Sequence, residues 1–259
     1  MSRIAIINPT TTRAFGERNG VAGEAVACAD TEILSVTMTD GPPSIEGHYD
    51  EAISTIALLE EIRKLERQEI DGYVLACFGD PGIWAAREIA QGPIIGIAEA
   101  SFHAASIVAT KFSVVTTLAR TKVICEHLLQ VMGMASRCGR VRATGIEVLA
   151  LEHGDRPTFE RIVAECRQAL DEDDSGAIVL GCAGMADLAK RLQDGLGVPV
   201  IEGVAAGVKL IESLVSLGLS TSKRGDLAYP IDKAYTGTLE RFSPSSSVPP
   251  PFPHKEAIR

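Results

Sequence analysis

Several features that would direct the chain to other functions are missing from its sequence. No apolar run approaches the ~20 residues of a transmembrane helix, so a membrane-spanning protein is not expected. Lysine and arginine total 25 against 34 acidic residues, and no basic cluster marks a helix face, so nucleic acid is not an expected partner. Residues 1–7 read directly as a strand, which leaves no room for a signal peptide.

Patterns typical of metal sites and of disulfide frameworks are missing too. The chain has six cysteines but no Cys-x-x-Cys pair and no His-x-x-x-His pair, so a structural zinc site is not expected. Six cysteines in 259 residues, without an export signal, favour reduced thiols over a set of disulfides. We therefore expect a cytoplasmic protein that binds no metal.

Short apolar runs alternate with helical patterns along most of the chain. One helical pattern covers residues 52–67, with apolar side chains at three-residue spacing. Continuous apolar strands that alternate with helices predict an α/β fold with parallel sheets covered on both faces. The expected strands are residues 4–8, 32–37, 72–77, 94–97, 112–117, 147–151, 177–182 and 198–202.

The alternation contains an apparent duplication. Residues 74–79 and 179–184 are both apolar runs that end in Cys-x-Gly, and 4–9 with 112–117, and 93–97 with 199–203, recur at nearly the same offset. The alternative is the general likeness of parallel α/β chains. The duplication predicts two pseudo-symmetric lobes with the active site in the cleft between them. The first lobe comprises 1–98 and about 203–230, and the second comprises 99–202. A flexible Pro/Ser-rich tail follows at 238–259.

Cys77 and Cys182, the cysteines of the repeated motif, are the candidate catalytic residues. Ligands of open α/β sheets bind beyond the carboxyl ends of the strands, where both cysteines lie. Each precedes a glycine and a helical pattern, and a helix N-terminus lowers a thiol pKa from ~8.5 toward neutrality. Two facing thiols could supply the acid and the base that a cofactor-free racemase needs. The alternative is a pair of small buried core cysteines.

Polar residues follow the first strand of each half. Asn8 and the threonines at 10–12 follow one strand, and Thr116 and Thr117 end its counterpart. These residues could donate hydrogen bonds from side-chain and backbone groups into the cleft. Helix capping is the alternative role, and the two roles are compatible.

Five segments together make the sequence specific to one group of enzymes: GPPSIEGHYDEA at 41–52, ACFGDPG at 76–82, GIAEA at 96–100, FSVVTT at 112–117 and LGCAGM at 180–185. With these segments the chain resembles the aspartate/glutamate racemase superfamily, and within it the hydantoin racemase branch, over about residues 3–230. One departure is at the start of the chain. The family's Asn-Pro-Asn-Thr-Ser is here Asn-Pro-Thr-Thr-Thr at 8–12, so Thr10 replaces an asparagine.

The resemblance implies two thiols on either side of a ring carbon, no cofactor, and a homo-oligomer. Amino-acid racemases of the superfamily hold the substrate carboxylate with Asn-Thr and Thr side chains after the two cysteines. Here those places hold Phe78-Gly79 and Ala183-Gly184, which favours an uncharged planar ring over a free amino acid. The expected substrate-binding residues are Asn8, Ser44, Ile45, Phe78, Gly79, Thr116, Thr117, Gly181, Ala183 and Gly184.

The expected activity is therefore cofactor-independent racemisation at C5 of allantoin or of a related 5-substituted hydantoin. One thiolate would remove the C5 proton, backbone N–H groups would stabilise the charge on the adjacent carbonyl oxygen, and the other thiol would return a proton. Alternatives are a racemase of amino-acid-derived hydantoins, a cysteine-dependent isomerase or decarboxylase of the superfamily, and a non-catalytic ligand sensor. The expected partner is a small molecule, with neither nucleic acid nor membrane.

Overall fold

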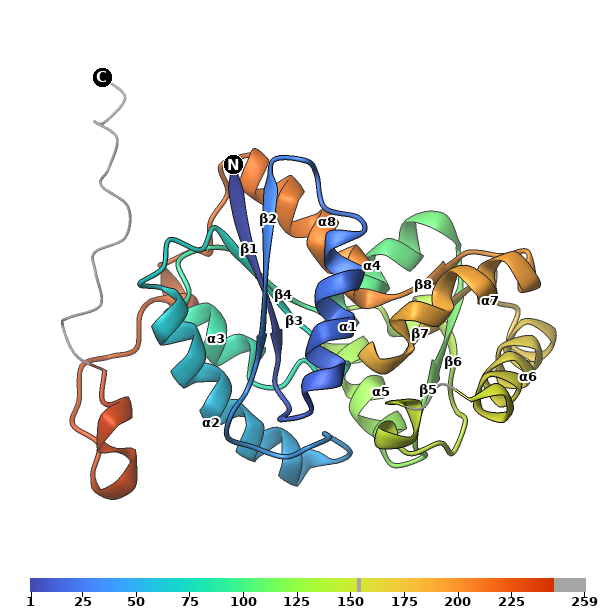
Figure 1. Cartoon of the computed structure of the whole chain (residues 1–259), viewed down its shortest axis with the longest axis horizontal. Helices are drawn as coiled ribbons and strands as arrows, with labels where there is room; N and C mark the ends of the chain where they lie inside the picture. Colours follow the sequence, from blue (N-terminus) through green and yellow to red (C-terminus); the bar gives the residue numbers. More distant parts are fainter. Residues whose placement is uncertain (153–154, 245–259) are drawn as a thin grey trace.

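A computed structural model of the protein describes residues 1–152 and 155–244 and confirms the predicted α/β fold (Figure 1). Two four-stranded parallel sheets are flanked by helices, and we call the elements around each sheet the first and the second lobe. The first sheet, in the order β2-β1-β3-β4, comprises β1 (Ser2–Asn8), β2 (Thr31–Thr37), β3 (Gly72–Leu75) and β4 (Ile94–Gly96). The second, in the order β6-β5-β7-β8, comprises β5 (Phe112–Thr116), β6 (Cys138–Ala143), β7 (Ala177–Leu180) and β8 (Val200–Ile201).

The central strands of the two sheets have the same register. Ile7 of β1 pairs with Leu75 of β3, and Val115 of β5 pairs with Leu180 of β7. In both sheets, the residue after the β3 or β7 leucine donates its N–H to the carbonyl of the paired residue at 2.8 Å. Each cysteine of the repeated motif comes two residues after such a leucine. The shared register therefore places the two cysteines at equivalent positions in the two sheets.

Helices cover both faces of each sheet because adjacent strand residues point to opposite sides. The helices are α1 (Arg13–Glu24), α2 (His48–Leu65), α3 (Ile83–Ile89), α4 (Ile97–Val108), α5 (Thr121–Val131), α6 (Arg156–Glu172), α7 (Ala189–Leu196) and α8 (Gly203–Ser216). Ala5 and Ile7 of β1 face a cluster with α2 and α3, whereas Ile4 and Ile6 face α4 and α8. In the second lobe, Val115 faces a cluster with α6 and α7.

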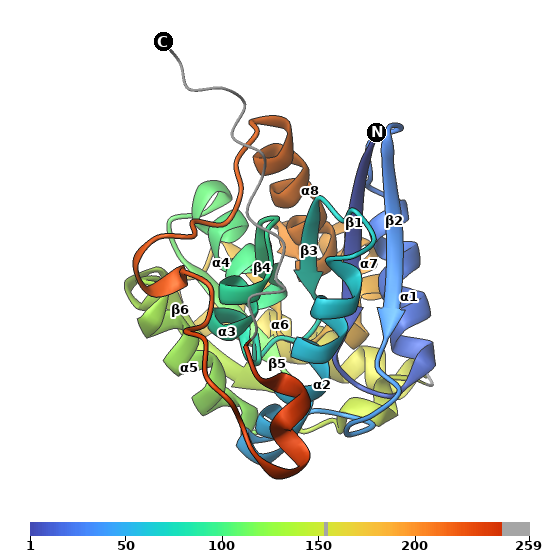
Figure 2. The same cartoon turned by 90° about the vertical axis from the view of Figure 1, so that its left-hand side faces the viewer.

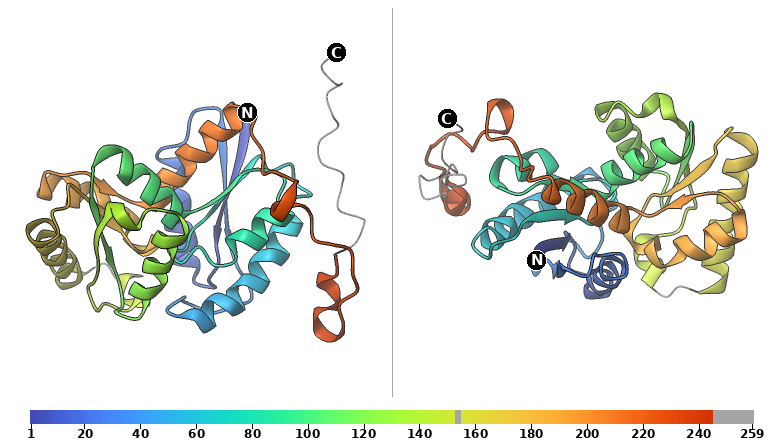
Figure 3. Two further views of the ribbon diagram at one scale, coloured as in Figure 1. Left: turned by 180° about the vertical axis from the view of Figure 1, so that it is seen from behind. Right: turned by 90° about the horizontal axis from the view of Figure 1, so that it is seen from above.

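The two lobes share one hydrophobic core. Side chains of β1 and β3 belong to the same buried cluster as Phe112 and Val114 of β5 and Val179 of β7. Helices α4 and α8 contribute to this cluster and lie where the two lobes meet (Figure 3). Phe102 of α4 stacks on Phe112 with ring centroids 5.9 Å apart. The relative position of the two sheets is therefore fixed by close packing.

One predicted strand is wrong. Residues 147–151 were expected to be extended, but Val148–Glu152 form a 3-10 helix, and the fourth strand of the second sheet is β6. Strand β6 lies at the sheet edge and carries Arg140 and Arg142, so it lacks the continuous apolar run by which the other strands were predicted. The remaining strands lie where expected, with small differences at their ends.

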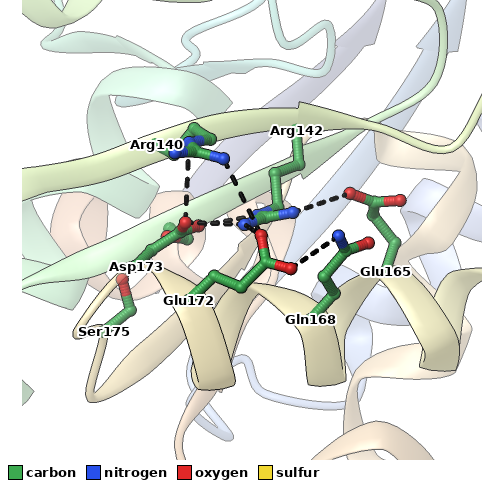
Figure 4. Close-up of polar contacts among 8 residues, drawn as sticks. Arg140, Arg142, Glu165, Gln168, Glu172, Asp173 and Ser175 are labelled. Atoms are coloured by element: carbon green, nitrogen blue, oxygen red, sulfur yellow. Dashed lines mark hydrogen bonds and ion pairs between the residues drawn. The ribbon is translucent and has the colours of Figure 1, made fainter.

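A cluster of ion pairs attaches β6 to the end of α6 (Figure 4). Arg142 is 6% exposed and donates from Nε and Nη2 to the two carboxylate oxygens of Asp173, both at 2.7 Å. Its Nη2 also pairs with Glu172 at 2.7 Å, and Ser113 of β5 donates to Asp173 at 2.9 Å. Buried charge on an edge strand is thus neutralised by paired hydrogen bonds.

The described part of the predicted tail forms a 3-10 helix, Gly237–Phe242, which contacts α2 (Figure 2). Arg241 pairs with Glu60 at 3.5 Å, and Arg63 donates to the Arg241 carbonyl at 3.2 Å. The rest of the predicted tail, residues 245–259, lies outside the described residues. Within the described ranges, the helices include none with the length and apolar character needed to cross a membrane.

Candidate active site

A cavity lies between the lobes at the carboxyl ends of β1, β3, β5 and β7. It contains both cysteines of the repeated motif and every expected substrate-binding residue except Ser44, whose neighbour Ile45 does line it. The lining residues are Asn8, Thr10, Phe15, Ile45, Glu51, Ala76, Cys77, Phe78, Gly79, Thr116, Thr117, Thr121, Ile124, Val148, Gly181, Cys182, Ala183 and Gly184. The fold thus brings together residues that are far apart in the sequence.

The turn that carries Cys77 is fixed by Asp80. The Asp80 N–H donates to the Cys77 carbonyl at 3.0 Å, and Asp80 has a φ of 44°, in the left-handed region. Its buried carboxylate accepts the N–H groups of Ala98 and Glu99, at 3.1 and 3.0 Å, in the first turn of α4. This pair of bonds compensates for the strained backbone and ties the Cys77 turn to the core helix.

The turn that carries Cys182 is fixed by contact with β5. Cys182 is the N-cap of a 3-10 helix, Ala183–Leu188, and its carbonyl accepts the Met185 N–H at 3.1 Å. The Thr116 hydroxyl donates to the Gly181 carbonyl at 3.0 Å. A Cβ at Gly181 would lie 2.7 Å from Thr116 Cβ, so glycine is required for this close approach.

Both thiols are free and share one hydrogen-bond arrangement. The N–H of Gly79 donates to the Cys77 sulfur, and the N–H of Gly184 donates to the Cys182 sulfur. Each donor is the glycine of the repeated Cys-x-Gly motif. The motif therefore has a physical role: the residue two positions after the cysteine turns its N–H back toward the thiol.

The predicted lowering of the thiol pKa values is wrong. Burial raises the pKa of Cys182 to about 11, against the lowering effect of the Gly184 N–H. Burial raises the pKa of Cys77 still further, and the nearby Glu51 carboxylate adds to this rise. Helix α3 begins only at Ile83, and Cys182 caps a short 3-10 helix, so neither thiol faces the N-terminus of a full α-helix. Desolvation therefore dominates at both thiols.

The side chain of Asn8 is engaged in its own loop. Its Oδ1 atom accepts the N–H and the hydroxyl of Thr10, at 3.2 and 2.9 Å, and its Nδ2 atom donates to the Thr12 carbonyl at 3.0 Å. Thr10 lines the cavity at the position where the resemblance implied an asparagine. Asn8 thus shapes the loop that presents Thr10.

Phe78 lines the cavity and also belongs to the shared core. Its ring meets Phe102 edge to face, with centroids 5.7 Å apart and an interplanar angle of 86°. Only 8% of the residue is exposed. This position is compatible with binding of a substrate ring and with filling the space between the lobes.

Several lining residues were not identified from the sequence. Thr121 and Ile124 lie in the first turns of α5, after β5, where a ligand contact could have been expected from the sheet topology. Val148 lies in the segment mistaken for a strand. Glu51 stood in a segment used for the resemblance, but a carboxylate in the first turn of a helix is ordinary and gave no signal.

In the described part of the chain, no group of three or more His, Cys, Asp or Glu side chains is arranged to hold a metal ion. The ionisable side chains that line the cavity are those of Glu51, Cys77 and Cys182, and the described lining includes no lysine or arginine. The arrangement offers two thiols for proton transfer and backbone N–H groups beside each of them.

One known protein family matches most of the chain. The model of the Asp/Glu/hydantoin racemase family matches residues 4–211. A hydantoin racemase of a Pseudomonas species is 45% identical over 240 residues, which cover 93% of this chain and 96% of that protein.

Two solved structures are similar over nearly the whole chain. An allantoin racemase from Klebsiella pneumoniae superposes with a TM-score of 0.92 at 53% identity, covering 95% of this chain and 100% of that one. An allantoin racemase from Pseudomonas fluorescens superposes with a TM-score of 0.88 at 37% identity, covering 91% and 100%. The chain therefore belongs to the Asp/Glu/hydantoin racemase family and is a racemase.

Proposed function

We propose that this racemase inverts C5 of allantoin or of a related 5-substituted hydantoin, with Cys77 and Cys182 as the two proton-transfer groups. One observation carries the substrate class. The described lining of the cavity contains no cationic side chain, whereas it does contain the carboxyl group of Glu51. A free amino acid would bring a carboxylate into a cavity whose residues after the two cysteines, Phe78-Gly79 and Ala183-Gly184, offer neither a cation nor a side-chain donor to bind it, and burying an unpaired charge is costly. A neutral hydantoin ring avoids this cost.

The proposed reaction needs only groups that line the cavity. The thiolate of one cysteine removes the C5 proton, and the electron pair spreads onto the adjacent carbonyl oxygen as an enolate. Backbone N–H groups of the Cys-x-Gly turns stabilise this oxygen. The thiol on the opposite face then delivers its proton to C5, and the enolate becomes a carbonyl again. The two cysteines have exchanged protonation states, ready for the reverse reaction.

The raised thiol pKa values suit the acid more than the base. With a pKa of about 11, Cys182 is mostly protonated at neutral pH, so either cysteine is available as the proton donor. The base must first lose its proton, and the Gly79 and Gly184 N–H groups favour that thiolate once it forms. Activity limited by the thiolate fraction rises about tenfold per pH unit between pH 7 and pH 10.

The test is a comparison of single-enantiomer substrates by the decay of their circular dichroism. We expect (S)-allantoin and a 5-alkylhydantoin to racemise, and L-aspartate and L-glutamate not to. The double variant Cys77→Ser/Cys182→Ser is the control, because hydantoins also racemise slowly without an enzyme. Faster racemisation of either amino acid than of any hydantoin would overturn the proposal.

A racemase of amino-acid-derived hydantoins is the second candidate. The 45% identity to a hydantoin racemase favours it, whereas the two allantoin racemase structures favour allantoin. The ratio of kcat/KM for allantoin to that for 5-isopropylhydantoin distinguishes the two. Membership of the family favours catalysis over the ligand sensor considered from the sequence. A cytoplasmic location and a homo-oligomer stay predictions.

A further inference from the structure

A carboxyl group that the reaction above does not use lies beside Cys77. Glu51, in the first turn of α2, lines the cavity, and its side chain is 17% exposed. Its Oε2 atom contacts Nδ1 of His48 at 3.2 Å. Its Oε1 atom is buried and has no hydrogen-bond partner among the described residues. The cavity therefore contains an acceptor that the described protein groups leave unpaired.

The position of Glu51 is tied to the Cys77 turn through Gly79. A Cβ on residue 79 would overlap Glu51 Oε1, so the carboxyl group occupies the space that the glycine leaves open. The N–H of the same glycine donates to the Cys77 sulfur. The carboxyl oxygen, the glycine and the thiol thus form one corner of the cavity.

A buried acceptor without a partner is unfavourable, and such groups in native proteins call for an explanation. A ligand that brings a donor supplies one here. Backbone N–H groups elsewhere in the lining are donors and suit the carbonyl oxygens of a hydantoin. A hydantoin also carries N–H groups, and the described lining offers no second carboxylate to receive them.

Resting on the proposed function, we propose that Glu51 is a specificity-determining residue that accepts an N–H attached to C5 of the substrate. C5 must lie next to Cys77 for proton transfer, and Glu51 lies beside that thiol. The C4 carbonyl oxygen, which becomes negative during the reaction, is excluded from this position by the carboxylate. The donors one bond from C5 are the ring N1–H and, in allantoin, the first ureido N–H.

A substrate series separates the two sources of the donor. 5-Isopropylhydantoin carries the ring N1–H alone, 1-methylallantoin carries the ureido N–H alone, and 1-methyl-5-isopropylhydantoin carries neither. The proposal predicts that wild-type enzyme loses about tenfold or more in kcat/KM only when the donor used by Glu51 is removed. Equal kcat/KM values for all of these substrates would overturn it.

A matched variant separates the lost hydrogen bond from crowding by the added methyl group. Glu51→Met keeps the volume of the side chain but removes the acceptor, so N-methylation should cost much less in this variant than in the wild type. Glu51→Gln keeps an acceptor oxygen and should restore most of the discrimination. Glu60→Met makes the same change on the exposed side of α2 and should behave as wild type.

The outcomes distinguish this inference from the function on which it rests. If the wild type racemises no hydantoin, the proposed function fails. If the wild type is active but Glu51→Met lowers kcat/KM by the same factor for every substrate, the residue acts through the fold or the Cys77 thiol, and the inference fails. A uniform shift of the pH profile for donor-free and donor-bearing substrates alike would also overturn it.

Discussion

The surroundings of Cys77 and Cys182 differ although the strands that place them match. Both cysteines follow a paired leucine by two residues, and both sulfurs accept the N–H of the second residue after them. The Glu51 and Asp80 carboxyl groups both raise the pKa of Cys77, whereas at Cys182 a single carboxyl group, that of Glu46, has this effect. The shared strand register therefore sets where the thiols lie, whereas the different carboxyl groups near them give the two thiols different pKa values.

The difference in pKa between the two thiols predicts their resting roles. Cys182, with a pKa of about 11, loses its proton more readily than Cys77, whose pKa is raised further by burial and by neighbouring carboxyl groups. We therefore expect the active minor form of the free enzyme to carry a Cys182 thiolate and a Cys77 thiol. The comparison is tested by replacing each cysteine, by alkylating the thiols, and by breaking one ion pair at an edge strand of each lobe.

The largest effect is expected from replacing either thiol. Cys77→Ser and Cys182→Ser should each lower the racemisation rate by ~10²–10⁴-fold, because each removes an acid or base that the proposed reaction requires. Each variant should still exchange the C5 proton of one enantiomer with deuterium from D2O, and the two variants should exchange opposite enantiomers. Proton NMR of each enantiomer in D2O measures this exchange. Exchange of the same enantiomer by both variants would contradict two-sided proton transfer.

A smaller effect, about tenfold or more, is expected in thiol alkylation. Since only the thiolate reacts, iodoacetamide should modify Cys182 before Cys77, and both rates should rise with pH from 7 to 10. Peptide mass spectrometry of a Cys28→Ser background, which removes an exposed thiol, follows both sites. Buried Cys166 serves as an internal control that should stay unmodified under native conditions. Faster modification of Cys77 would reverse the assignment of roles.

The smallest effects are expected at the edge strands β6 and β2, where two variants compare the contribution of an ion pair to the free energy of unfolding. Arg142→Met in β6 leaves Asp173 without its buried partner and should lower the free energy of unfolding by about 3 kcal/mol. Glu32→Gln in β2 breaks an exposed pair with Arg3 and should cost less than ~1 kcal/mol. Urea unfolding of both variants at pH 7 measures the difference. Equal losses of unfolding free energy would show that the buried and the exposed ion pair stabilise their edge strands to the same extent.

The same variants have an expected pH dependence. Arg142 holds the pKa of Asp173 below its usual range, so this contribution to stability is present above the usual carboxyl pKa of ~3.9 and is lost as the pH falls through the lowered value. The gap between wild type and Arg142→Met should therefore narrow in unfolding experiments repeated at progressively more acidic pH. If the difference in unfolding free energy between wild type and Arg142→Met grew as the pH fell, the Arg142–Asp173 pair would not be its cause.

Much of the frame could be predicted from the sequence, because buried parallel strands are continuous apolar runs and the Cys-x-Gly motif marks their ends. Strand β6 was not predicted, because its arginines are neutralised by carboxylates at the end of α6, which lies further along the chain. Glu51 was not identified because the close approach of its carboxyl group to Gly79 is visible only in the folded chain. The thiol pKa values were misjudged because the sequence shows neither how deeply the thiols are buried nor that no full α-helix begins beside them.

The two unequal thiols also have a kinetic consequence. The enantiomers of a hydantoin have the same free energy in water, so the equilibrium constant of their interconversion is one, whatever the enzyme. The values of kcat/KM for the two directions must then be identical, even though in the proposed mechanism Cys182 starts one direction and Cys77 the other. The inequality of the thiols can appear only as a matched change of kcat and KM: the enantiomer that is bound more tightly must be turned over more slowly, by the same factor.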